Sequence, residues 1–419
     1  MNNILLIILI LISLNYLFEL LLDVLNLRYR SKAIPNILSD VYDISTYAKQ
    51  QEYKTETTKF SFIQGALSFV AIFFVLYFGL LGKLHGYIAQ FGFSGVTTTL
   101  AFFGILFIVG QIMSIPFSLW SIFVIEEKYG FNRVTPRLFV FDFLKSIFLA
   151  VILGGGLLAL ITLAFQISGQ WFWLIALAIM LLFSLLANAL YSRVIIPLFN
   201  KQTPLASGDL YDDIKELAQK VGFPVNKVFV IDGSKRSSKA NAYFTGFGRN
   251  RRVILYDTLI NSMQNNEILA VLSHEIGHYK KKHIWMNFAL GGMQMAIILY
   301  VFNLFAQSTD LSIALGYSNA TEPIFHLSLI AFGLLFMPIE HIIGIGTNMM
   351  SRKMEYQADE FASKLNYGNE LISALKKLSK ESLSNLTPHP AYVFVNYSHP
   401  TLFLRVRKIL DRVGHQTKK

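Results

Sequence analysis

Long uninterrupted runs of apolar residues recur along the chain, and most of the polar segments between them are short. A helix needs about 20 apolar residues to cross the hydrocarbon core of a bilayer. Runs of this length cover roughly residues 4–24, 62–82, 98–124, 146–168, 171–195, 284–306 and 324–348. Only the region of Ser168–Gln170 separates the fourth run from the fifth. The pattern predicts a mainly α, polytopic membrane protein with about seven transmembrane helices.

The first apolar run is expected to be a membrane helix rather than a signal peptide. No basic segment precedes it, and no small-x-small cleavage pattern follows it. Arg28 and Arg30 come directly after it instead.

Residues 196–283 form the one long polar segment between two of these runs. Hydrophobic periodicity predicts a helix from a cap at Ser207 to about Val221, and another over 266–283. The β-rich runs lie at 227–232, 242–247 and 253–256, with a basic turn at 248–252 between the last two. This segment is therefore expected to fold as a small α/β unit, and the tail at 349–412 as mostly helical.

These patterns divide the chain into four parts. They are a five-span membrane region at 1–195 with two cytosolic loops, the α/β insert at 196–283, a two-span hairpin at 284–348 and a tail at 349–419.

The distribution of Lys and Arg predicts the orientation in the membrane. If the loop at 25–61 is cytosolic, the segments on the same side hold 36 of the 37 basic residues, and Lys83 is the exception. Such an asymmetry follows the positive-inside rule, so the N-terminus is expected outside and the α/β insert inside. The same rule accounts for the net charge of +11, and no nucleic-acid partner is expected.

The composition limits the chemistry that the chain can perform. Only 15% of its residues are charged, whereas about 25% is usual for a soluble protein. There is no cysteine, which excludes disulfides and Cys-ligated metals and leaves His, Asp and Glu as ligands.

His274-Glu-Ile-Gly-His278 has the H-E-x-x-H pattern within the expected helix at 266–283. Residues four apart share one face of a helix, so both imidazoles can reach one metal ion. Glu275 is one residue round and points at the open coordination position, which suits a base that activates water. The alternative is a polar helix with two exposed histidines.

Glu355 has the right position for the third protein ligand that a catalytic zinc needs. His278 precedes the sixth run, and Glu355 follows the seventh, by about six residues each, or roughly 9 Å beyond the same membrane face. The short segment 307–323 joins these runs, so they are expected to pair as a hairpin. We therefore predict one Zn²⁺ ion bound by His274, His278 and Glu355. Asp359, one turn further on, is expected to hold a ligand His by its second nitrogen; a solvated helix face is the alternative for both carboxylates.

Several further motifs resemble those of the type I CaaX prenyl protease family, over about residues 20–412. Besides HEIGH at 274–278, they are SRxxExQAD at 351–359, RSSKANAYF at 236–244, YSHPT at 397–401, EEKYGFN at 126–132 and PLFNKQTPL at 197–205. The resemblance implies seven helices around a large chamber, a cytosolic zinc site and cleavage within the C-terminal tripeptide of prenylated peptides.

The resemblance also implies roles for single residues. Asn241 and Ala242 would lie on an edge strand that pairs with the substrate backbone. His399 and Arg405 would sit over the site and assist the oxyanion or the C-terminus of the substrate. Lys239 and Ala240 replace the His-Ser often seen in the family before Asn241. The compact, Lys-rich and Cys-free chain favours a bacterial member in the inner membrane, with the endoplasmic reticulum membrane as the alternative.

Two other functions remain open at this point. A quality-control protease for membrane proteins would share the mechanism and differ in substrate. A channel or transporter with a structural metal would not need Glu275 beside an open position, and would want a fourth protein ligand such as His283 or His399. The expected partners are the bilayer and a peptide or lipidated peptide.

Overall fold

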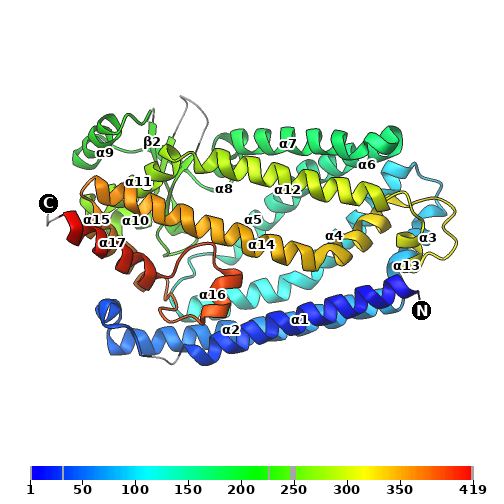
Figure 1. Cartoon of the computed structure of the whole chain (residues 1–419), viewed down its shortest axis with the longest axis horizontal. Helices are drawn as coiled ribbons and strands as arrows, with labels where there is room; N and C mark the ends of the chain where they lie inside the picture. Colours follow the sequence, from blue (N-terminus) through cyan, green and yellow to red (C-terminus); the bar gives the residue numbers. More distant parts are fainter. Residues whose placement is uncertain (1, 31–32, 225–226, 246–251, 417–419) are drawn as a thin grey trace.

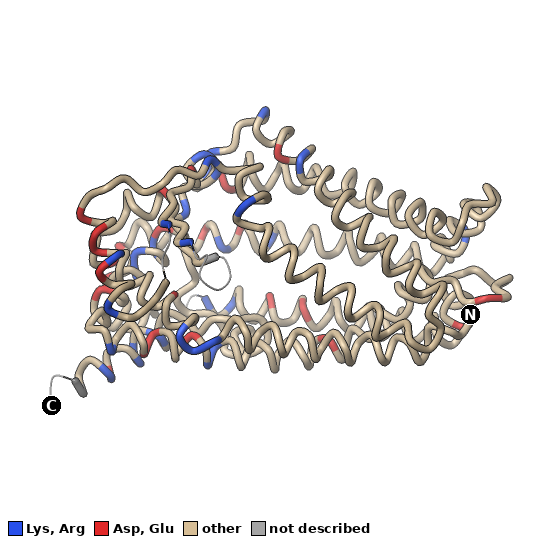
Figure 2. Tube along the Cα trace, turned by 90° about the horizontal axis from the view of Figure 1, so that it is seen from above, with Lys and Arg blue, Asp and Glu red and all other residues tan. Residues whose placement is uncertain are grey.

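The computed structural model describes residues 2–30, 33–224, 227–245 and 252–416. Long helices run along its longest axis, and the strands and most of the shorter helices collect at the end that holds the C-terminus (Figure 1). Figure 2 shows that most charged residues gather at this same end and are sparse along the rest of the helices. The molecule therefore has an apolar helical part and a polar part at one end.

Six helices among the described residues are long and apolar enough to cross a bilayer, which confirms the predicted fold class. They are α1 (Asn3–Tyr29), α2 (Ile44–Tyr77), α4 (Gly95–Trp120) with its continuation to Glu126, the stretch Pro136–Phe199, α12 (His283–Phe305) and α14 (Phe325–Lys364).

The fourth of these stretches contains the fourth and fifth predicted runs. The chain reverses at Gly169, which has a positive φ of 50°, and the helices on its two sides pack against each other. The interruption at Ser168–Gln170 is therefore a turn between two neighbouring helices. The stretch consists of α5 (Pro136–Leu149), a π-helical segment (Ala150–Gly155), α6 (Gly156–Ser168), α7 (Phe172–Leu190), a second π-helical segment (Tyr191–Ile195) and α8 (Ile196–Phe199).

Two short helices close the end of the bundle opposite the charged part. They are α3 (Leu80–Ala89) and α13 (Asp310–Ala314), and the Gly82 N–H donates to the Leu315 carbonyl between them at 2.9 Å. The membrane helices bury an aromatic core around Phe102, Phe172 and Phe302.

A four-stranded mixed sheet forms the base of the α/β unit, in the order β1-β2-β4-β3. The central strands β2 and β4 are parallel, and β1 and β3 pair antiparallel with them at the two edges. Among the described strands, β3 has a neighbour on one side only. The strands are β1 (Gln202–Pro204), β2 (Lys227–Ile231), β3 (Ala242–Thr245) and β4 (Arg252–Tyr256).

Helices pack on the sheet and bury a second core that includes Leu217, Leu255 and Ile268. They are α9 (Asp209–Lys220), α10 (Asp257–Ser262) and α11 (Asn265–Lys280). The tail is mostly helical, as expected, and covers α11 and α14. Its helices are α15 (Gly368–Glu381), α16 (Pro390–Asn396) and α17 (Leu402–Gln416).

The structure corrects several expected boundaries in this unit. The cap at Ser207 was wrong, because α9 starts after Gly208, which makes no side-chain capping bond. The helix expected over 266–283 ends at Lys280, since Lys282 has a left-handed backbone (φ 59°) and a new helix starts at His283. Strand β1 was not foreseen, because three residues are too few for a periodic signal. The predicted basic turn at 248–252 lies almost entirely outside the described residues.

Glu355 lies on the same continuous helix as the seventh apolar run, not on a separate helix after it. Helix α14 has 40 residues, so it extends for about 60 Å. A single rigid element therefore carries Glu355 from the membrane part into the polar part.

The positive-inside distribution generates a test of orientation, for which the absence of native cysteine is convenient. We expect Ser318→Cys to be labelled by a membrane-impermeant thiol reagent from the extracytosolic side, and Lys235→Cys from the cytosolic side. Both positions are exposed. Labelling in right-side-out and inverted vesicles measures this, with the cysteine-free parent as the control. Labelling of Ser318→Cys from the cytosolic side alone would overturn the topology.

Candidate metal centre and catalytic cleft

Helices α11 and α14 cross closely, and this crossing brings the predicted ligands together. Gly277 lies at the contact: a Cβ added there would come within 3.0 Å of the Ala358 Cα and of the Phe361 Cβ. A side chain at this position would push the helices apart. The glycine of the H-E-x-x-H pattern therefore has a packing role that is separate from metal binding.

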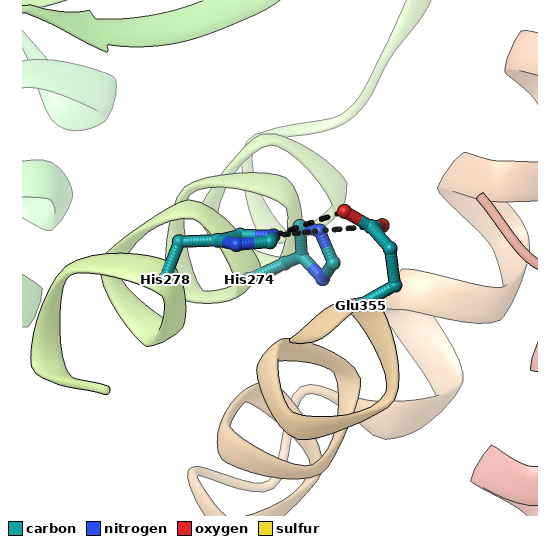
Figure 3. Close-up of side chains that lie close together, drawn as sticks. All are labelled: His274, His278 and Glu355. Atoms are coloured by element: carbon teal, nitrogen blue, oxygen red, sulfur yellow. Dashed lines mark hydrogen bonds and ion pairs between the residues drawn. The ribbon is translucent and has the colours of Figure 1, made fainter. Parts of the chain in front are cut away.

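His274, His278 and Glu355 converge at the crossing (Figure 3). The Nε2 atoms of the two imidazoles are 3.2 Å apart. Glu355 Oε1 lies 3.2 Å from Nε2 of His278, and Glu355 Oε2 lies 3.5 Å from Nε2 of His274.

These spacings fit a small tetrahedral ion. With bonds of about 2.0–2.2 Å, the ligand atoms of a tetrahedral zinc stand roughly 3.3–3.6 Å apart. Two neutral nitrogens and one carboxylate oxygen are also a donor set typical of catalytic zinc. The group contains three such residues among those that the structure describes, so a fourth position is left for water or substrate.

Asp359 orients His274 from behind, as its spacing from Glu355 predicts. The Nδ1–H of His274 donates to Asp359 Oδ1 at 2.9 Å. Burial lowers the pKa of His274, but the bonds to Asp359 and Glu355 outweigh burial and raise it to about 9. A carboxylate behind a ligating imidazole fixes its tautomer and makes it a stronger donor to a metal.

Arg405 lies behind Asp359 rather than over the cleft. Its guanidinium donates to both Asp359 oxygens, at 2.6 and 2.9 Å, and its Nη1 is 3.6 Å from Glu355 Oε2. Its side chain is 11% exposed, whereas that of His399 is 64% exposed. The structure thus separates two residues that the resemblance placed together. His399 faces the site, with its Nδ1 3.0 Å from Glu355 Oε2. Arg405 is buried behind the site and binds Asp359.

His283 is a residue of the site that the sequence analysis named only as a possible fourth ligand of a structural metal. Its Nδ1 lies 3.0 Å from Nδ1 of His278, and its Nε2 lies 2.8 Å from Oε1 of Gln357. If Nδ1 of His278 carries the proton, that proton is donated to His283, which in turn donates to Gln357. His283 thus holds His278 as Asp359 holds His274. It approaches His278 from the side away from Glu355, so it is not a fourth ligand. Helical spacing gives no signal for it, because the turn at Lys282 separates it from α11.

A cleft of about 490 Å³ opens beside the convergent ligands. Glu275 and His399 line it, and so do Tyr243 and Phe244 from the edge strand β3. Tyr191 and Trp285 contribute its wall on the side of the membrane helices. Half-buried Glu275 therefore faces the space in which a substrate would lie.

Of the two residues that the resemblance places on the edge strand, the structure puts Ala242 on it and Asn241 just before it. Asn241 directly precedes β3, and Ala242 is its first residue. The Asn241 side chain accepts a bond from the Ala242 N–H at 2.8 Å. The cleft itself is lined by the two residues that follow, so the direct contact with bound substrate is expected to extend to Tyr243 and Phe244.

Two family models match the chain in succession. Residues 24–201 match the model described as "CAAX prenyl protease N-terminal, five membrane helices", and residues 204–413 match "Peptidase family M48".

Similar proteins of known name match over nearly the whole chain. The CAAX prenyl protease 1 homolog of Arabidopsis thaliana is 38% identical and covers 94% of each chain. CAAX prenyl protease 1 of Saccharomyces cerevisiae is 34% identical, over 92% of this chain and 90% of its own. The crystal structure of S. mikatae Ste24p superposes with a TM-score of 0.90 at 33% identity, over 98% of this chain and 99% of that chain.

The two carboxylates of α14 are expected to differ in their effect on metal affinity. Glu355→Ala removes a direct bond and should nearly abolish Zn²⁺ binding, whereas Asp359→Ala only frees His274 and should weaken it by about 10–100-fold. Competition with a chromogenic chelator measures both affinities. Glu360→Ala is the matched control, because Glu360 lies on the same helix and pairs with Lys364 and Arg412 instead. If Asp359→Ala strips the metal and Glu355→Ala does not, the two roles are reversed.

Proposed function

We propose that this chain, which belongs to peptidase family M48 and, within it, to the type I CaaX prenyl proteases, binds one zinc ion and cuts peptides that end in a prenylated CaaX sequence. Membership of this family makes it a membrane-embedded metalloendopeptidase. The convergence of His274, His278 and Glu355 beside Glu275 carries the proposal. A channel with a structural metal has no use for this arrangement of a free carboxylate beside an open position.

The mechanism assigns each group a step. A zinc ion held by the three ligands would polarise the substrate carbonyl and make a water molecule a better nucleophile. Glu275 takes a proton from the attacking water and delivers it to the nitrogen of the leaving peptide. His399, exposed beside Glu355, is positioned to donate to the negative charge that develops on the carbonyl oxygen. Asp359, Arg405 and His283 keep the ligands in place through the hydrogen bonds and ion pairs described above.

The substrate backbone is proposed to pair with β3. An edge strand offers unpaired N–H and C=O groups that read no side chains, so an extended peptide of varied sequence can bind there. Since β3 lines the catalytic cleft, a peptide paired with it would lie with one of its bonds near the metal ligands.

The names of the relatives support the prenylated substrate, because they are called CAAX prenyl proteases. The many apolar helices support access of a lipidated peptide from the bilayer. A quality-control protease for membrane proteins is the rival function, and it predicts cleavage without regard to a prenyl group or a nearby C-terminus.

The remaining assignments are proposals on the same basis. We propose that the active site faces the cytosol, in a bacterial inner membrane rather than the endoplasmic reticulum, on the strength of the basic loops and of the composition. We also propose that the regions 1–195, 196–283, 284–348 and 349–419 act as a membrane region, a catalytic insert, a hairpin and a tail that carries the third ligand.

The proposed role of Glu275 is tested by Glu275→Gln. We expect zinc to be retained and hydrolysis to fall by at least about 10²-fold, because the amide cannot take a proton. Metal content and turnover of a farnesylated peptide are measured together, with the unprenylated peptide alongside. Glu216→Gln, an exposed change on α9, serves as the control. Near-normal turnover by Glu275→Gln would remove this residue from the mechanism, and equal cleavage of both peptides would favour the quality-control function.

The pairing with β3 is tested by N-methylating one backbone amide of the substrate at a time. Alternate residues of a strand point their N–H groups toward the same neighbour, so cleavage should fall at every second position only. The control at each position is an exchange of the side chain that leaves the amide intact, which should have little effect. A loss that is uniform along the peptide, or absent, would contradict binding by strand addition.

A further inference from the structure

A second cavity adjoins the catalytic cleft on the other side of His399. It has a volume of about 390 Å³, and His399 lines both spaces. Arg405 and Lys54 also line the second cavity, Lys54 reaching it from α2. Hydroxyl and amide groups such as Ser379 and Asn385 fill out the wall, and no Asp or Glu is among its lining residues. The cavity is therefore rich in donors and cations and suits an anion.

The positive charge of Arg405 is already compensated within the protein. Asp359 accepts from it through both carboxylate oxygens, and Glu355 lies 3.6 Å away. Arg405 therefore has little charge left to offer a substrate.

Among the residues that the structure describes, Lys54 is the cation of this cavity without an ion-pair partner. Lys54 is half-buried, and its ammonium makes no hydrogen bond or ion pair with the residues that the structure describes. The ring of Tyr53 has its centre 5.6 Å from Nζ. Glu126 attracts it at longer range, but its carboxylate oxygens are bonded to the Tyr53 hydroxyl at 2.6 Å and to Lys239 at 3.1 Å. A partly desolvated ammonium gains most from a carboxylate that enters the same space.

We propose that this cavity is the subsite for the free C-terminal carboxylate of the peptide substrate, and that Lys54 is the specificity-determining residue that binds it. The proposal rests on the proposed peptidase function. Three residues in extended form span about 10 Å, so a peptide cut three residues from its end has its carboxylate near the catalytic cleft. The cavity beyond His399 is the neighbouring space with an uncompensated cation. A substrate with an amide at its end would leave Lys54 without a counter-charge.

The experiment compares kcat/KM for one prenylated peptide as its free acid and as its C-terminal amide. We expect the wild-type enzyme to prefer the acid by about 10–100-fold, as for a charge-assisted hydrogen bond. Lys54→Gln should reduce this ratio to about 1–2 by slowing only the acid, chiefly through KM, and Lys54→Arg should restore the preference. Lys49→Gln removes the same charge from an exposed position on α2 outside this cavity and should keep the wild-type ratio.

A second readout does not depend on turnover. The released tripeptide carries the same carboxylate, so its inhibition constant should rise by a similar factor in Lys54→Gln and stay unchanged in Lys49→Gln. Zinc content should be normal in all variants, because Lys54 does not belong to the convergent ligands.

The outcomes separate this proposal from the function on which it rests. If the wild type prefers the acid and Lys54→Gln prefers it as strongly, or if the wild type cuts acid and amide equally, the subsite is wrong although the enzyme is a peptidase. If Lys54→Gln loses zinc or fails to fold, Lys54→Arg and Lys54→Met replace it in the test. The proposal is overturned if neither of these two variants loses the preference for the acid. Failure of the wild type to cut either peptide would instead refute the proposed function.

Discussion

The close crossing of α11 and α14 at Gly277 is the contact on which the rest of the site depends. Two of the proposed ligands lie on one helix and the third on the other, so their separation is set by the distance between the helix axes. Gly277 against Ala358 keeps that distance small, and overpacking at such a contact costs about 1–3 kcal/mol. A wider crossing would move Glu355 away from both imidazoles and leave a two-residue site.

The same crossing concentrates buried charge, which the fold must compensate. Glu355 and Asp359 are almost fully buried, and Arg405 lies against both. Unpaired, either carboxylate would destabilise the fold by several kcal/mol, because removing one partner of a buried pair leaves an uncompensated charge. The two imidazoles have different supports: His274 rests on a carboxylate and His278 on a neutral histidine and amide. This difference keeps the number of buried negative charges small while still fixing both rings.

The position of the site relative to the membrane follows from the length of α14. One helix carries the apolar run and Glu355, so the proposed metal ligands stand at a fixed distance from the apolar run. The edge strand β3 and residues of α7 and α12 line the same cleft, and the tail contributes His399 to it. A peptide anchored in the bilayer by a lipid would therefore meet a strand edge and a metal site within a few residues of its anchor.

The sequence by itself determined the features that depend on local spacing. Apolar runs of about 20 residues specify membrane helices, and a separation of four residues puts His274 and His278 on one face. His278 and Glu355 lie at equal distances from a hairpin of two spans, and helix rise converts residue number into height. This spacing predicted that Glu355 would converge with the two imidazoles, as it does in the structure. Other features of the site were decided by the tertiary structure alone, because they depend on packing between segments that are distant in the sequence. The strand order that leaves β3 at an edge, the turn at Lys282 that aims His283 at His278, and the engagement of Arg405 by Asp359 have no periodic signal. Lys54 lies 220 residues before His274, and only the packing of α2 against the tail brings it beside the site.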